Sequence, residues 1–109
     1  MLVTLDEAKQ YLRVDTADED AVITGILASA KRLCVDVARL TETQWEDIDS
    51  DKAKTKRYTA TELTAVRESM RVAVLYALGY LFEHREEADH HDLTLTLRSL
   101  LFSVREGVI

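Results

Sequence analysis

Proline is absent from the 109-residue sequence, and glycine occurs only three times, at Gly25, Gly79 and Gly107. These two residue types usually form the tight turns of hairpins and many-stranded folds, so their scarcity argues against a sheet-rich protein. No glycine lies near another, which excludes the glycine-rich loop that cradles phosphates in nucleotide-hydrolysing proteins. The composition favours helices.

Cysteine is equally scarce, and Cys34 is the only one. A single thiol can form neither a disulfide within the chain nor a multi-thiolate zinc site, and this fits a reducing compartment. Because Cys34 falls on an apolar helical stripe, we expect a buried, unreactive thiol and not a nucleophile.

Basic residues and long apolar runs are limited as well. Fourteen Lys and Arg stand against twenty Asp and Glu, and the formal net charge of −6 would repel a nucleic-acid backbone. The longest apolar run, Val72 to Phe82, is about half a membrane span, and no basic stretch precedes an apolar one at the N-terminus. We therefore expect no sequence-specific DNA binding, no secretion signal and no membrane span. With 47% hydrophobic residues, the chain suffices for one domain, residues 1–109.

Helical periodicity dominates the first forty residues. Thr4 and Glu7 form a capping-box pattern at the start of a short helix that should end near Arg13. Thr16 and Glu19 offer a second capping box, which predicts the start of a second helix. Its apolar residues repeat at steps of three and four: Ile23, Ile26, Ala30, Leu33, Val37 and Leu40. A coiled-coil seam uses the same spacing, so the stripe faces either another helix of the chain, which we favour, or a neighbouring subunit.

Regularity is lost between residues 43 and 60, which we interpret as an irregular linker with room for one helical turn around Trp45. An acidic block precedes a basic block, and such blocks usually lie on solvated surface. Trp45 is the exception, because an indole in a polar linker needs a place in the core or at an interface. Long irregular segments often carry function, so this one is a candidate partner-facing loop. Its candidate residues are Trp45, Glu46, Asp47, Asp49, Asp51, Lys52, Lys54, Lys56 and Arg57.

Two further helices follow the linker. Thr59 or Thr61, with Glu62, can cap a third helix that ends in the apolar run 72–82. A helix that is apolar all round must be covered on all sides, and we expect part of that cover from another subunit. Asp92 is the expected cap of a final helix. The prediction is an all-α domain of about four helices, of which the second and third are the longest.

No arrangement of catalytic or metal-binding residues emerges. Nearly every Asp and Glu lies in a predicted cap, loop or polar face, where nothing separates the pKa values of two carboxylates for acid–base work. His84, His90 and His91 are possible metal ligands, but their spacing is not that of a metalloprotease helix. A solvated bend between helices explains them better. We predict no enzyme, no cofactor and no metal site.

The order of residues is distinctive in two segments. The first is Leu5-Asp6-Glu7-Ala8-Lys9-Gln10-Tyr11-Leu12-Arg13-Val14-Asp15, followed by Glu19-Asp20-Ala21-Val22-Ile23, and the second is Leu81-Phe82-Glu83-His84-Arg85-Glu86. The first resembles the opening of the head-tail connector (adaptor, or DNA-packaging) proteins of long-tailed phages. The second resembles their aliphatic-aromatic-Glu-Asn-Arg-Glu signature, with His84 in place of Asn. With the helix order, the resemblance spans Leu5 to about Arg105. The chain departs from the family in lacking a Gly-Arg after its second helix and a Pro or Tyr before Arg105.

The resemblance implies a structural protein of the head-tail junction of the virion, made in the cytoplasm of the bacterial host. It implies a ring, dodecameric on the virion, that binds the portal protein, extends the DNA channel and receives the next head-completion or tail protein. It implies neither catalysis nor a cofactor. With a channel implied, the candidate loop of residues 45–57 is a candidate channel-facing loop as well as a partner-facing one. The charge of −6 suits this role, because an acidic ring surrounds DNA without gripping it.

Ring formation needs a heterologous interface, in which one face of each subunit meets a different face of the next. We assign Arg13, Asp15, Arg85 and Glu86, charged residues at predicted helix ends, to inter-subunit or structural ion pairs, and favour an intrachain role for the last two. Two other functions stay open. One is a homodimeric interaction or regulatory module with the second helix as its two-fold seam, and the other is a nucleic-acid binder that uses the basic segment 52–57.

Overall fold

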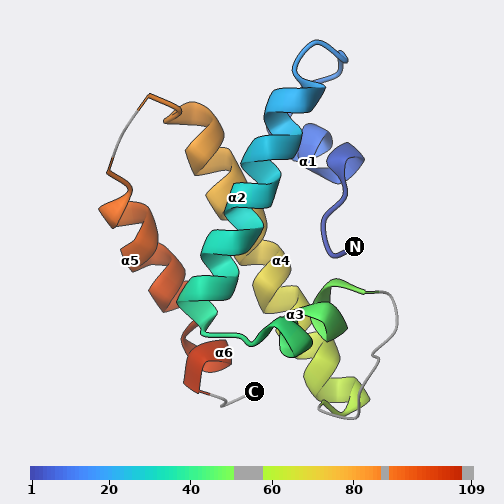
Figure 1. The fold of residues 1–109 in the computed structure, drawn as a ribbon, viewed down its shortest axis with the longest axis vertical. Coiled ribbons are helices and arrows are strands. Elements are labelled where there is room, and N and C mark those ends of the chain that lie inside the picture. Colours follow the sequence, from blue (N-terminus) through green and yellow to red (C-terminus); the bar gives the residue numbers. More distant parts are fainter. Residues whose placement is uncertain (51–57, 87–88, 107–109) are drawn as a thin grey trace.

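The computed structural model describes residues 1–50, 58–86 and 89–106. These parts contain helices and no strand (Figure 1), which confirms the all-α prediction for them. The second and third predicted helices are the longest, with 19 and 24 residues, as expected. The helices are α1 (Leu5–Leu12), α2 (Asp20–Ala38), α3 (Glu42–Asp49), α4 (Ala60–Glu83), α5 (His91–Leu100) and α6 (Phe102–Glu106).

The predicted number of about four helices is wrong, because six occur in the described ranges. The additional α3 occupies the part of the linker that we expected to be irregular, from residue 43 to 49. Thr41 and Gln44 form a capping box at its start, and Ile48 is fully buried at its other end. The final helix is divided at Leu101, a fully buried residue where the chain turns between α5 and α6.

Some of the helices begin at the side-chain caps that we predicted, and others do not. Capping boxes begin α1 at Thr4 and α4 at Thr59, which confirms the first prediction and decides between the two threonines of the second. The box of Thr16 and Glu19 is wrong. The backbone amide of Asp20 donates instead to the carbonyl of Ala17, so a turn leads into α2 without a side-chain cap. Asp92 is likewise inside the first turn of α5 and not its cap.

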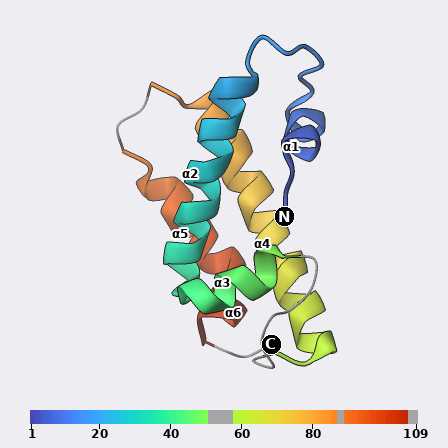
Figure 2. The ribbon, with the colours of Figure 1, turned by 45° about the vertical axis from the view of Figure 1, so that its right-hand side comes forward.

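The two long helices, α2 and α4, run along each other through the middle of the molecule in both views (Figures 1 and 2). α1 packs on both of them, and α5 also packs on both. α3 contacts α4, while α6 contacts α2 and α5. Apolar residues from α1 to α5 form one buried cluster. The molecule measures 40 × 28 × 19 Å along its principal axes.

The apolar stripe of α2 faces the inside of the chain. Ile23, Ala30 and Cys34 are fully buried, and Ile26 is partly buried against the same core. The stripe therefore belongs mainly to the intrachain core, as we favoured. The apolar run of α4 is covered on one side only: Val74 and its neighbours are buried, but Val72 remains 57% exposed.

Arginine side chains fasten α3 and the N-terminal segment to α4. Arg67 donates from Nε to the carbonyl of Ile48 at 3.1 Å and from Nη2 to the carbonyls of Asp47, at 3.1 Å, and Ser50. Arg71 donates to the carbonyl of Leu2 at 2.9 Å and pairs with Glu7. Because the last carbonyls of a helix have no partner within it, Arg67 satisfies groups that α3 leaves open.

Candidate functional site

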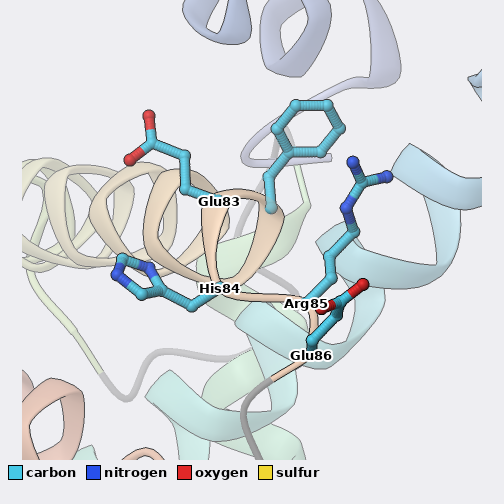
Figure 3. Close-up of a pocket in the computed structure, with 5 residues that line it drawn as sticks. Glu83, His84, Arg85 and Glu86 are labelled. Carbon is cyan, nitrogen blue, oxygen red and sulfur yellow. The ribbon is translucent and has the colours of Figure 1, made fainter.

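The end of α4 carries the six-residue segment that resembles the connector signature. Glu83 is the last residue of α4, and the backbone amide of His84 donates to the carbonyl of Tyr80 at 2.9 Å to close the helix. Residues 82–86 line an open pocket of about 580 Å³ (Figure 3). The pocket therefore lies at a helix end, where side chains can spread in several directions.

Glu83 and Arg85, which have opposite charges, leave this helix end on different sides. Glu83 and Arg85 extend away from each other, and Arg85 extends toward α2 (Figure 3). The Arg85 guanidinium lies 4.6 Å from the centre of the Phe82 ring, a cation–π contact. Its Nη1 lies 3.2 Å from Oε1 of Glu19, the N-cap of α2. An arginine held between a ring and a carboxylate has a restricted orientation, so Arg85 ties the end of α4 to the start of α2.

The histidines near this end are mostly packed against an aromatic ring. His84 stacks on Tyr80 with the ring centres 4.0 Å apart, and its Nδ1 lies 2.8 Å from the Tyr80 carbonyl oxygen. His90 meets Tyr80 edge-on at 6.0 Å. The interpretation as a solvated bend therefore holds only for His91, which is exposed. Among the described residues, no group of three or more His, Cys, Asp or Glu side chains could hold a metal ion.

The two segments of the family resemblance meet in space, although they lie far apart in the sequence. Glu19 of the first pairs with Arg85 of the second. Tyr11 of the first lies across α4, because a Cβ on Gly79 would be only 3.1 Å from the tyrosine Cε2. Lys9 also pairs with Asp20 at 2.8 Å and joins α1 to α2. The α1–α2 connection and the end of α4 thus form one end of the molecule.

The predicted ion-pair residues are placed as follows. Arg13 caps α1 in the left-handed conformation, with φ of 60°, and Asp15 follows it on the exposed connection to α2. Within ranges 1–50, 58–86 and 89–106, neither residue forms an ion pair, and Glu86 forms none. Arg85 pairs with Glu19, a partner that sequence reasoning missed although it lies in the first resembling segment.

The candidate loop is divided between described and undescribed residues. Trp45 is half-buried on α3, and Glu46 is exposed beside it. Asp47 is fully buried, and Asp49 accepts a hydrogen bond from the Leu2 amide at 2.9 Å. This half is therefore a docked helix, and a role toward a channel or partner stays a prediction. The other candidates lie outside the described residues: Asp51, Lys52, Lys54, Lys56 and Arg57.

The Cys34 thiol takes no part in this site. It is fully buried in α2, and desolvation raises its pKa from 9.0 to about 12. A thiol that stays protonated is a poor nucleophile, as expected from its place on the apolar stripe. In the part of the chain that the structure describes, no helix is long and apolar enough to cross a membrane.

Comparison with known proteins identifies the family. A family model described as phage gp6-like head-tail connector protein matches residues 2–107. No curated protein and no solved structure matches the chain significantly. The family is a structural one, whose members connect head and tail in the phage particle, and it is not known as a family of enzymes. The match extends over nearly the whole sequence, so the chain belongs to the phage gp6-like head-tail connector proteins.

Proposed function

We propose that this chain is the subunit of a connector ring that binds the portal vertex, continues the DNA channel and completes the head for tail attachment. The observation that carries the proposal is the family match over residues 2–107. The partners are further copies of the chain, the portal protein and the next head-completion or tail protein. The family resemblance implies about twelve copies, and heterologous contacts between identical subunits can close into such a ring.

The charge of the chain supports passage of DNA without tight binding. Each subunit carries a formal charge of −6. Affinity for DNA comes largely from basic side chains that replace counterions on the phosphates, and an excess of carboxylates opposes that exchange. A ring of such subunits would surround the duplex and let it slide during ejection.

The surface that the rival proposal of a two-fold dimer requires is buried within the subunit. A seam along α2 would need the stripe that contains Ile23, Ala30 and Cys34, and these residues are fully buried within the chain. Opening them to a partner would expose the core cluster. The nucleic-acid alternative depends on the basic segment 52–57, which lies outside the described residues.

The proposal is tested with DNA-filled heads that lack their connector. Purified chain is added to these heads, and DNA retention is measured by protection from nuclease. Electron microscopy of the same heads then shows whether density is added below the portal. We expect retained DNA and a ring of about twelve subunits on the portal. Unprotected DNA together with bare portals would overturn the proposal, and an unrelated acidic helical protein serves as the control.

A further inference from the structure

An exposed apolar ridge runs over α4 and α1. Val72 and Tyr76, one turn apart on α4, are 57% and 40% exposed, and Tyr11 of α1 is 49% exposed. Tyr11, Tyr76 and Gly79 line the same shallow pocket of about 340 Å³. We call Tyr11, Val72 and Tyr76 the ridge. Large apolar side chains gathered at this exposure are typical of a surface that another protein covers.

An apolar groove lies between α2 and the end of α4. It has a volume of about 490 Å³, and its walls include Val22, Gly25 and Ile26 from α2 with Leu81 from α4. Arg85 forms one edge. We call Val22, Gly25, Ile26 and Leu81 the groove. Val22 is 45% exposed, so the apolar wall is open to solvent in the isolated subunit.

Gly25 is unexplained by the subunit alone. It lies in the interior of α2, where glycine is less favourable than alanine, because it loses more backbone freedom. A Cβ built on it meets no atom within 4 Å. No close contact inside the described chain therefore requires the missing side chain. Its absence does deepen the groove, which is what a closely approaching helix would need.

The ridge and the groove are on different sides of α4. Each residue turns an α-helix by about 100°, so Leu81 lies about 140° around α4 from Tyr76. The ridge of one subunit consequently cannot fill its own groove. A second copy can supply it.

The charges favour contact between a ridge and a groove over contact between two ridges. Glu83 lines the same pocket as Tyr11 and Tyr76, and it has no ion pair among the described residues. Arg85, at the groove, contacts Glu19 through Nη1, and a guanidinium has five N–H donors, so it can bind a second carboxylate. Ridge against ridge would bring two Glu83 carboxylates together, whereas ridge against groove brings Glu83 toward Arg85.

We infer that neighbouring copies of this chain join head to tail, with the ridge of one copy packed into the groove of the next. This inference rests on the proposed connector function and identifies the surfaces through which its ring would form. The contact is heterologous, so a joined pair still presents one free ridge and one free groove for further copies.

Cysteine cross-linking tests the pairing directly. Val72→Cys and Val22→Cys place one thiol on the ridge and one in the groove, both at exposed positions. Cys34 is fully buried and does not compete. A short bis-maleimide should join the two variants into a covalent dimer when they are mixed, and neither variant alone should give it. A chain with both substitutions should give a ladder of covalent oligomers.

Ser103→Cys, at an exposed position on α6, replaces Val72→Cys in the matched control mixture. Cross-linking of the test mixture no stronger than this control overturns the inference. Equal cross-linking by Val72→Cys alone overturns it too, because that result means a two-fold contact. Portal binding by the unmodified chain is measured separately. If the chain binds the heads but gives no ridge-to-groove cross-links, the proposed function stands and these surfaces are rejected. If the cross-links form but the chain does not bind the heads, only the proposed function is rejected.

A second variant tests the groove without added thiols on α2. Gly25→Leu fills the groove with a side chain for which the isolated subunit has room. We expect its melting temperature to stay at or above that of the unmodified chain, while self-association falls about tenfold or more through overpacking of the contact. Unchanged self-association in the folded variant contradicts the inference.

Discussion

Arg67 supplies the side-chain hydrogen bonds that fasten the end of α3 to α4, and replacing it should loosen that helix. Arg67→Met keeps an apolar stem of similar length and removes the guanidinium. The lost contacts are those to the carbonyls of Asp47, Ile48 and Ser50. These carbonyls belong to the last residues of α3 and to its C-cap, Ser50, where the helix cannot satisfy them internally. The Asp47 carbonyl also accepts a hydrogen bond from the Ser50 hydroxyl at 3.4 Å.

The size of the effect follows from the kind of bond. A hydrogen bond to a charged group contributes about 1.5–3 kcal/mol when its partner is buried. Arg67 is half-buried, and water can reach some of the freed carbonyls, so we expect a total loss of about 2–4 kcal/mol. For a domain of this size, that corresponds to a decrease of the melting temperature by about 10–20 °C.

Trp45 makes the assay specific, because it is the only tryptophan and lies on α3. Urea unfolding is followed by tryptophan fluorescence and, in parallel, by circular dichroism, which reports all helices. In Arg67→Met, we expect the fluorescence transition to move to lower urea and to precede the loss of ellipticity. Arg98→Met, at an exposed position of α5, is the matched control. If the two variants unfold within about 0.5 kcal/mol of each other, Arg67 does not hold α3 in place.

Three further predictions concern other parts of the fold. Burial raises the pKa of Cys34 from 9.0 to about 12, so only the unfolded thiol ionises between these two pH values. The free energy of unfolding should therefore fall more steeply with rising pH in this range than it does in Cys34→Ala. If a thiol reagent at pH 8 labels the native chain as fast as the unfolded chain, the thiol is not buried. The hydrogen bond from Arg71 lowers the pKa of Glu7, so the ionised Glu7 stabilises the fold above the ordinary value of 4.5, and this stabilisation is lost as pH falls below it. Acid titration followed by circular dichroism should show a smaller decrease of stability in Glu7→Gln than in the unmodified chain. Equal decreases would count against the pairing of Glu7 with Arg71. Gly25→Ala should stabilise the isolated subunit by about 0.5–1 kcal/mol in urea unfolding, since the added methyl group meets open space, and a loss of stability would show a contact that the structure lacks.

Residues identified from the sequence explain part of the candidate site. Arg85 and Glu86 were identified through the signature at the end of α4, and both line the pocket there. Glu19, the partner of Arg85, was missed, although it belongs to the other resembling segment. Gly25 offered a signal of its own, because an isolated glycine within a helical pattern often has a packing or functional reason.

Local patterns determined what the sequence could reveal by itself. The helical class, the two long helices and the capping boxes at Thr4 and Thr59 depend on residues three or four positions apart, which the helix itself brings close together. The order of residues in two short segments was enough to indicate the family, which the match over residues 2–107 then showed. Both kinds of information depend only on the order of residues along the chain.

Tertiary structure alone decided which distant surfaces meet. α3 has eight residues and few apolar ones, so its local signal is weak, and its docking on α4 through Ile48 and Arg67 supports it. The pairing of Glu19 with Arg85, 66 positions apart, follows from how α2 and α4 pack. The same packing buries Val74 and leaves Val72 exposed, because the helices that contact α4 (α1, α2, α3 and α5) cover the first side chain and not the second.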